Sequence, residues 1–167
     1  MGRKDTGKNF ENEIRRSLKG SKHIWWFRIQ DTNDINRFVK IAVAEKQPAD
    51  FFSVYRGRPI MLEAKTSRNL TSFPLYYAST PAIAKHQISA GLKLERMGGI
   101  SLILIRREEF RNKKCYAISA QQAKDLYSNK DNKKSIKWSW FEENAYIVER
   151  LKAPLRWNLH KLYEEII

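Results

Sequence analysis

Residues 48–67, PADFFSVYRGRPIMLEAKTS, place three charged side chains in an otherwise apolar and aromatic stretch: Asp50, Glu63 and Lys65. The apolar runs on either side of RGRP predict two strands, 49–55 and 60–66, joined by a turn at Gly57. The charged side chains then belong to strands of the core, where uncompensated charge is costly to bury. The chain therefore needs a partner for this charge, and that need constrains both its fold and its chemistry.

The spacing of the three charged residues predicts where they lie on the hairpin. Glu63 and Lys65 are two residues apart on one strand, so both side chains leave the same face of the sheet. Ala64 points to the other face, and its carbonyl remains available as a ligand. Asp50 comes 13 residues before Glu63, on the partner strand, so the hairpin can bring the two carboxylates together at one edge.

Paired carboxylates beside a lysine are typical of phosphate chemistry with a hard cation. Mg²⁺ takes oxygen ligands, usually one or two carboxylates with waters and substrate phosphate. A neighbouring lysine can orient the attacking water or counter charge that develops on the phosphate. The alternative is a solvated Glu–Lys pair on an edge strand, which contributes little to stability.

The charge of the whole chain favours a polyanionic partner. Its 167 residues carry 32 Lys and Arg against 18 Asp and Glu, a formal net charge of +14. Each phosphate that a protein neutralises releases condensed counterions, so such an excess suits nucleic acid. No run approaches the roughly 20 apolar residues of a membrane span, and we expect no membrane partner. The alternative is charge that serves solubility alone.

The hydrophobic pattern predicts a mixed α/β layer fold in a single domain, 9–167, after a flexible basic arm, 1–8. Beyond the hairpin we expect strands over 23–31, 100–105, 115–119 and 145–149, and helices over 9–18, 119–128 and 155–166. A further helix is expected to begin with Thr80 as its cap and Pro81 in its first turn. Gly98-Gly99 is expected to end that helix.

Several short motifs, in order along nearly the whole chain, resemble the RecU family of Holliday-junction resolvases. PADFFSVYRGRPIMLEAKTS is followed by FPL, HQI and GGISLILI. GKNFENEI resembles the family's N-terminal Gly-x-x-x-Glu helix, and KKSIKWSWFEENAYIVERLKAPLRWNLHKL resembles its C-terminal segment. The family belongs to the PD-(D/E)xK superfamily, which implies a restriction-endonuclease-like fold, a mixed central β-sheet flanked by helices. The segment between Arg28 and Asp50 departs from the pattern, being shorter than the projection that engages the junction centre in bacterial members.

Carried over by position, the resemblance implies a catalytic set of Asp50, Glu63, Lys65 and Glu11. The carboxylates of this set would bind the metal, with the Ala64 carbonyl as a further ligand, and the lysine would be catalytic. Glu11, four residues after Gly7, matches the helix glutamate that completes the metal site, and its alternative is a solvated residue of the first turn. Glu13 lies about 200° around the helix from Glu11 and is the weaker candidate.

Candidate DNA-binding residues occur in separate segments: Arg3, Lys4, Lys8, Arg28, Arg56, Arg58, Gln87, Lys133 and Lys134. Separate basic segments around one acidic site suit a branched substrate, whose arms diverge. Gln87 has helix capping or packing as its alternative, and Arg28 could instead pair with Asp31 or Asp34. Trp138 and Trp140 could stack on unpaired bases, although core packing is expected for at least one of them.

The resulting hypothesis is a Mg²⁺-dependent endodeoxyribonuclease that resolves four-way junctions, with Mn²⁺ able to substitute and no small-molecule cofactor. The resemblance implies a homodimer, because two strands of like polarity must be nicked, and products with 5′-phosphate and 3′-hydroxyl ends. The strand HIWWFRI and the apolar residues of 145–167 are the candidate dimer interface. With the single Cys115, we expect a cytoplasmic protein of a bacterial cell or phage-infected host. The alternatives are another nuclease on this fold, restriction-type or single-strand-specific, and a non-catalytic protein that binds branched DNA.

Overall fold

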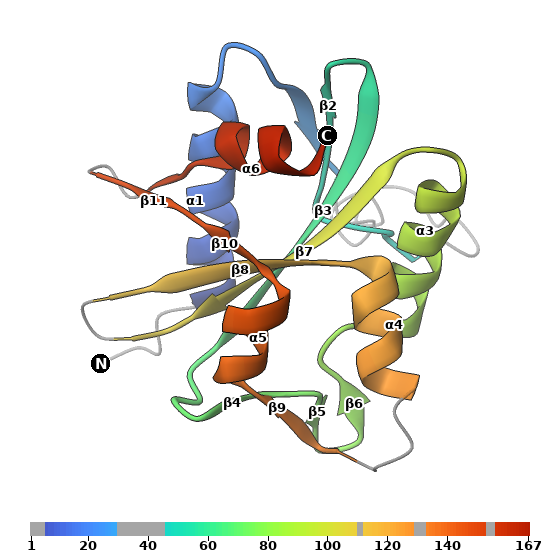
Figure 1. The fold of residues 1–167 in the computed structure, drawn as a ribbon, viewed down its shortest axis with the longest axis vertical. Helices are drawn as coiled ribbons and strands as arrows, with labels where there is room; N and C mark the ends of the chain where they lie inside the picture. The colour runs from blue at the N-terminus through green and yellow to red at the C-terminus, as the bar shows by residue number, and fades with distance from the viewer. Residues whose placement is uncertain (1–5, 30–45, 110–111, 129–132, 153–155) are drawn as a thin grey trace, which may run out of the picture.

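The structure, a computed structural model, describes residues 6–29, 46–109, 112–128, 133–152 and 156–167. A six-stranded mixed sheet forms its centre, in the order β1-β2-β3-β7-β8-β10 (Figure 1). The strands are β1 (Trp25–Arg28), β2 (Phe51–Tyr55), β3 (Arg58–Ser67), β7 (Ile100–Arg107), β8 (Lys114–Ser119) and β10 (Tyr146–Val148). β3 and β7 pair in parallel, and the other neighbours pair antiparallel.

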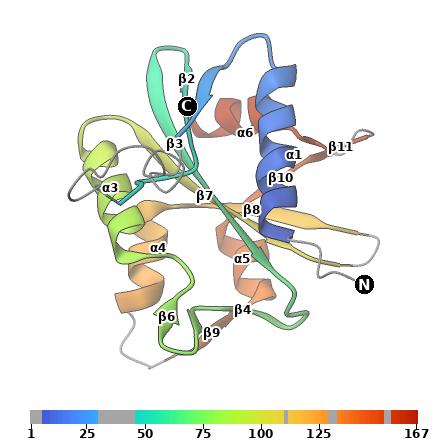
Figure 2. The same ribbon diagram turned by 180° about the vertical axis from the view of Figure 1, so that it is seen from behind.

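Helices cover both faces of this sheet. α1 (Thr6–Gly20) and α6 (Leu159–Ile166) contribute to one core cluster, and the two helices overlap in the opposite views of Figures 1 and 2. α3 (Lys85–Arg96), α4 (Ala120–Ser128) and α5 (Trp138–Asn144) contribute to the core on the other face. Two-stranded ribbons complete the fold: β4 (Ser72–Pro74) with β9 (Ser135–Lys137), β5 (Tyr76–Tyr77) with β6 (Thr80–Pro81), and β11 (Arg150–Leu151) with β12 (Arg156–Trp157). Across the described segments, no helix has the length and apolar character needed to span a membrane.

The central strand β7 explains why ISLILI reads as one continuous apolar run. Leu102 and Leu104 pack into the cluster that includes α1 and α6, whereas Ile103 and Ile105 pack into the cluster of α3, α4 and α5. A strand with a hydrophobic layer on each face has no polar side to alternate with. The prediction of a strand buried on both faces is therefore confirmed.

The hairpin of β2 and β3 forms where the sequence predicted it. Phe51 pairs with Leu62 and Tyr55 with Arg58, so the turn consists of Arg56 and Gly57. Both turn residues have positive φ, 48° and 77°. Turns with φ above zero at both central positions match the twist of the strands that they join.

The start predicted for the helix after residue 80 is wrong. Thr80 and Pro81 form β6 and pair with β5, and α3 begins at Lys85. The reason lies in partners outside the helix: the Ala82 N–H donates to the Leu75 carbonyl at 2.8 Å, and the Ile83 N–H donates to the Tyr127 hydroxyl at 3.0 Å. The predicted end is confirmed, because Gly98 has a φ of 84° and the Gly99 N–H donates to the Leu94 carbonyl.

The remaining elements follow the predicted order with shifted ends. α1 begins at Thr6, within the stretch 1–8 that was expected to be an arm. β1 is shorter than the strand predicted over 23–31, and α6 begins at Leu159, after β12. The predictions for Arg3 and Lys4 lie outside the described residues, and so does the connection predicted over 32–47 as far as residue 45.

Candidate active site

β3 presents Glu63 and Lys65 on one face of the sheet, as their spacing predicted. The Lys65 ammonium forms an ion pair with Glu63 Oε1 at 2.8 Å. Only 7% of the Glu63 side chain and 23% of the Lys65 side chain are exposed. Ala64, between them, packs against the core on the opposite face. The ion pair therefore lies at the edge of the core rather than in open solvent.

Asp50 reaches the same place from the start of β2. Its backbone is fixed on both sides, because the Ile29 N–H donates to the Asp50 carbonyl at 2.9 Å and the Asp50 N–H donates to the Leu62 carbonyl at 3.1 Å. The Ala64 N–H then donates to Asp50 Oδ2 at 2.8 Å. The Asp50 carboxylate thus meets β3 at the residue between Glu63 and Lys65, and the hairpin brings together the residues that the sequence predicted would meet.

The two carboxylates are held in an environment that disfavours their charge. Burial, and then the nearby Asp50 charge, raise the pKa of Glu63 to about 7, against the opposing effect of Lys65. Burial also raises the pKa of Asp50, although the Ala64 N–H, Lys65 and Arg28 oppose that rise. Among the described residues, Glu63 Oε2 is buried and has no hydrogen-bond partner.

This donor set fits a hard divalent cation. The Asp50 charge raises the pKa of the buried Glu63 carboxyl, and one oxygen of that carboxyl lacks a partner among the described residues. A divalent cation bound between the two carboxylates would neutralise this charge. The described residues contain no group of three or more His, Cys, Asp or Glu side chains gathered closely enough to hold a metal by themselves. A cation here would therefore bind through Asp50 and Glu63 together with backbone oxygen, water or substrate.

Glu11 lies on α1, which covers the face of the sheet opposite to Glu63. Arg28 Nη2 donates to Glu11 Oε2 at 2.6 Å. The same arginine lowers the pKa of Asp50, so it stands between the helix carboxylate and the strand carboxylate. Asp31 and Asp34, its expected alternative partners, lie outside the described residues. The role of Glu11 as a ligand stays a prediction.

Glu13, two residues further along α1, belongs to a buried structural network. Its carboxylate pairs with Arg106, whose side chain is fully buried, and accepts a hydrogen bond from Trp157 Nε1 at 3.2 Å. The Arg106 guanidinium also lies 4.7 Å from the centre of the Phe10 ring. The network therefore ties α1, the helix that carries Glu11, to β7.

Sequence reasoning missed Arg106, although a signal for it exists. Arg106 continues the alternation of Leu102 and Leu104, whose side chains face α1. A charged residue at a strand position whose side chain faces the core needs an opposite charge beside it. Glu13 was the available carboxylate on the facing helix.

Gln87 combines the two alternatives that the sequence left open. Its Oε1 accepts a hydrogen bond from the Ala84 N–H at 3.0 Å, at the start of α3. Its side chain also favours the charged form of Glu63 and so lowers the pKa of that carboxyl. Trp138 is buried in the core, and its Nε1 donates to the Asn69 carbonyl at 2.9 Å, so the packing alternative is confirmed for that residue.

The basic candidates of the hairpin turn lie at the far end of β2 and β3 from Asp50. Arg56 forms an ion pair with Glu164 at 3.1 Å, and Arg58 donates to the Gly98 carbonyl. Lys133 and Lys134 are exposed and line a recess next to Tyr76. Their contacts with DNA stay predictions.

Both edges of the sheet expose apolar side chains. On β1, Trp25 and Phe27 are 62% and 44% exposed, and their ring centroids lie 5.5 Å apart. On β10, at the other edge, Tyr146 and Ile147 are also exposed. Unpaired edge strands with large apolar side chains are ready to pair with another chain.

Comparison with known proteins places this chain in a family. Residues 7–162 match the family model of RecU, recombination protein U. Two curated relatives, each named Holliday junction resolvase RecU, come from Shouchella clausii and Pediococcus pentosaceus. The first is 35% identical over 111 residues, which are 66% of this chain and 47% of the relative. The second is 33% identical over 108 residues, which are 64% of this chain and 50% of the relative.

A third relative of the same name, from Bacillus subtilis, is 29% identical over 112 residues, which are 66% of this chain and 50% of that protein. The chain thus matches about half the length of these relatives. Among solved structures, the Holliday junction resolvase Hjc of Archaeoglobus fulgidus is similar, with a TM-score of 0.52, 14% identity, and coverage of 84% of this chain and 95% of that one. This likeness confirms the predicted restriction-endonuclease-like fold.

Proposed function

The chain belongs to the RecU family, and on that premise we propose that it is a metal-dependent endonuclease that nicks four-way DNA junctions. The observation that carries the proposal is the meeting of Asp50, Glu63 and Lys65 where the start of β2 lies beside β3. A protein that only binds DNA has no need of two adjacent carboxylates with raised pKa values, because DNA repels negative charge.

In this proposal Asp50 and Glu63 hold Mg²⁺, with the Ala64 carbonyl as a further oxygen ligand. Glu11 completes the site when its carboxylate turns from Arg28 toward Asp50. A bound divalent cation would supply a water of lowered pKa and would neutralise charge on the phosphate. Mn²⁺, which prefers the same oxygen ligands, is expected to substitute for it.

Lys65 has a separate task from the carboxylates. Its ammonium is paired with Glu63 and is partly exposed, so that a phosphodiester could approach it from solvent. From there it donates a hydrogen bond to the phosphate oxygen on which negative charge develops, or orients the attacking water. It binds no cation itself, since an ammonium has no lone pair.

The substrate and the assembly follow from the charge and from the sheet edge. The net charge of +14 provides affinity for any DNA. Selection of a branched substrate then depends on contacts with several diverging arms. Two nicks of like polarity require two sites, and the exposed Trp25 and Phe27 on β1 support a homodimer through that edge.

The test is a cleavage assay with Mg²⁺ on a labelled four-way junction, on linear duplex of the same sequence and on single strand. At about 150 mM salt, where nonspecific contacts weaken steeply, we expect the junction to be nicked and the duplex to be spared. Asp50→Asn should reduce the cleavage rate by more than about 100-fold. Loss of a residue that only supports a metal ligand already costs about 10–100-fold, and loss of the ligand itself should cost more. Asp125→Asn, which changes an exposed aspartate of α4, is the matched control.

The outcomes separate the candidate functions. Binding of the junction by Asp50→Asn should persist, because affinity comes from distributed Lys and Arg side chains. Equal cleavage of duplex and junction at every salt concentration would leave a general nuclease on this fold. Full cleavage by Asp50→Asn would remove the proposed site.

A further inference from the structure

A recess lies between the ribbon of β5 and β6 and the start of α3. It has a volume of about 780 Å³ and is lined in part by Lys46, Tyr76, Lys85, His86 and Tyr127. Pockets that hold small molecules span about 300–1,000 Å³. The recess therefore has room for a group the size of a nucleotide.

One wall of the recess is aromatic and rigid. Tyr76 is 40% exposed, and its ring meets that of Tyr127 edge to face, with centroids 5.6 Å apart. The Tyr127 hydroxyl donates to the Leu75 carbonyl at 2.9 Å and accepts from the Ile83 N–H at 3.0 Å. These two bonds fix the ribbon at both ends. The exposed part of the Tyr76 ring is thus presented at a set position rather than on a loose loop.

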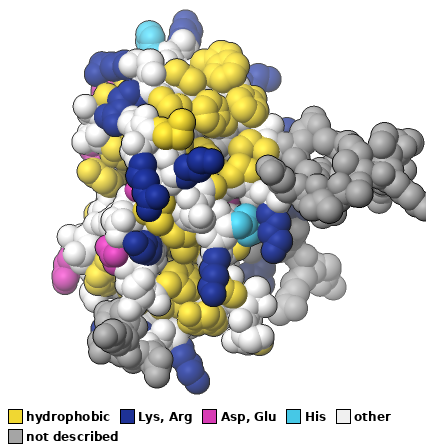
Figure 3. Space-filling view, turned by 90° about the vertical axis from the view of Figure 1, so that its right-hand side faces the viewer, with side chains coloured by type: hydrophobic (Ala, Val, Ile, Leu, Met, Phe, Trp, Pro, Cys, Tyr) yellow, Lys and Arg dark blue, Asp and Glu magenta, His cyan; other side chains and the backbone are white. Residues whose placement is uncertain are grey.

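The other walls of the recess are basic. Lys46, Lys85 and His86 line it, and no Asp or Glu is among its described lining residues. Lys133 and Lys134 line an adjoining recess of about 460 Å³ that shares Tyr76 and Tyr127. On the side of the molecule that carries α3 and α4, Lys and Arg side chains lie among hydrophobic ones (Figure 3). An aromatic surface between cations matches a ligand that has both a flat ring and phosphates.

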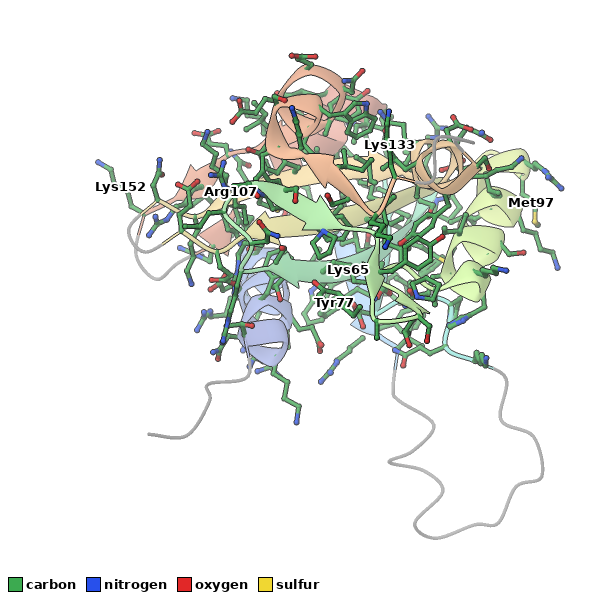
Figure 4. All side chains as sticks on the ribbon, turned by 90° about the horizontal axis from the view of Figure 1, so that it is seen from below. Lys65, Tyr77, Met97, Arg107, Lys133 and Lys152 are labelled. Atoms are coloured by element: carbon green, nitrogen blue, oxygen red, sulfur yellow. The ribbon has the colours of Figure 1, made fainter. Side chains whose placement is uncertain are left out.

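The recess also adjoins the candidate active site. Tyr77 follows Tyr76 on β5, and its hydroxyl donates to the carbonyl of Thr66, the residue after Lys65, at 3.5 Å. Figure 4 shows Tyr77 and Lys65 close together. On α3, Gln87 favours the charged form of Glu63, and its neighbour His86 lines the recess. A DNA strand that places a phosphate at Lys65 therefore passes the ribbon of β5 and β6.

We propose that this recess binds one unpaired nucleotide of the DNA strand that is cut, with its base stacked on Tyr76 and its phosphate held by Lys85. The position of the nucleotide beside the cut rests on the proposed function, whereas the recess itself does not. Stacking on an aromatic side chain tolerates any base, because every base has a flat π-face. A branch point can release a base from its pair, whereas an intact duplex cannot do so without a cost in free energy.

The test measures affinity for a short fluorescent oligothymidylate, by anisotropy in EDTA, so that cleavage plays no part. Tyr76→Leu should weaken this binding about 10-fold, because it removes the ring and keeps an apolar side chain. Tyr76→Phe should bind like the wild type. The matched control is Tyr146→Leu, since Tyr146 is 42% exposed on β10 and lies outside the recess. Affinity for linear duplex should be the same in all four proteins.

Lys85→Gln provides a second measurement that does not depend on the ribbon. Lys85 is exposed, so its substitution should leave the fold intact. The slope of log affinity against log salt for oligothymidylate should fall by about 0.7, the value for one phosphate contact on a single strand. Unchanged affinity in Tyr76→Leu together with an unchanged slope in Lys85→Gln would overturn the proposal. Equal weakening in Tyr76→Leu and Tyr76→Phe would overturn the stacking on Tyr76.

Junction cleavage by the wild type separates this proposal from the proposed function. If the wild type nicks no junction but Tyr76→Leu still loses affinity for oligothymidylate, the nucleotide recess stands and the proposed function fails. If the wild type nicks the junction and Tyr76→Leu matches it in both kcat/KM and oligothymidylate affinity, the function stands and the recess proposal fails.

Discussion

Replacement of Glu63 by glutamine should stabilise the metal-free protein at pH 8 and at the same time abolish cleavage. Burial and the Asp50 charge raise the pKa of Glu63 from its ordinary value of 4.5 to about 7. Because the folded-state pKa is the higher one, the stability that neutral Glu63 provides is fully present below about pH 4.5. It is lost as the pH rises through about 7. At pH 8 the folded protein carries a buried carboxylate that unfolding would release to water.

The size of the effect follows from the same rise in pKa. At about 1.4 kcal/mol for each pH unit, the rise from 4.5 to about 7 corresponds to an upper limit of about 3.5 kcal/mol. Glutamine keeps the shape of the side chain and removes the charge, but it leaves the Lys65 ammonium without its partner at 2.8 Å. Water can replace that partner, because the Lys65 side chain is partly exposed. We therefore expect the free energy of unfolding to rise by about 1–3 kcal/mol.

The assay is urea unfolding in EDTA at pH 5 and pH 8 for the wild type, Glu63→Gln and the control Glu165→Gln. Glu165 is an exposed residue of α6. The gain in Glu63→Gln should appear at pH 8 and largely vanish at pH 5, and the control should show no gain. Added Mg²⁺ should raise the unfolding midpoints of the wild type and of Glu165→Gln but not that of Glu63→Gln, because only the first two proteins keep both proposed ligands. A variant less stable than the wild type at pH 8, or a gain of equal size at both pH values, would refute the reasoning.

Three further predictions concern the lysine, the buried network and the assembly. Lys65→Ala should lower the cleavage rate at saturating Mg²⁺ by about 100-fold or more, yet keep the rise in unfolding midpoint that Mg²⁺ causes; weakened Mg²⁺ binding with a normal rate would contradict this role. Glu13→Gln should lower the free energy of unfolding by about 2–3 kcal/mol in urea titrations, because the buried Arg106 then loses one of its two carboxylate partners and keeps only Glu108; an unchanged midpoint would contradict it. Light scattering at micromolar concentration should show a dimer, and Trp25→Glu on the β1 edge should shift it to monomer; a monomeric wild type, both free and on junction DNA, would refute the dimer.

Local patterns were sufficient for the hairpin and for the charged residues that it carries. The alternation of β3 determines that Glu63 and Lys65 share a face, because successive side chains of a strand point in opposite directions. The turn at Gly57 determines that Asp50 lies opposite the same segment, because the turn sets the register of its two strands. These relations involve neighbours in sequence or one short loop, so the order of the residues already contains them.

Local signals were misleading where a distant partner competed with them. Thr80 and Pro81 have the chemistry of a helix start, yet they form a strand, because β5 and the Tyr127 hydroxyl bind the backbone groups on either side. The Tyr127 hydroxyl lies 44 residues from Ile83. Propensity contributes less free energy than such a set of tertiary hydrogen bonds, so the tertiary contacts decide the outcome.

By itself, the sequence determined the alternation of the strands, the turn that aligns them and therefore the meeting of Asp50, Glu63 and Lys65. Only the tertiary structure decided the partners of the two glutamates on α1: Glu11 pairs with Arg28, and Glu13 pairs with Arg106, 93 residues away. Glu11 and Glu13 have identical side chains and lie only two positions apart on one helix. Their surroundings differ because α1 packs across the sheet with one side toward β7 and another toward the end of β1. Which charges meet across that packing depends on how the layers stack, and no local pattern contains that information.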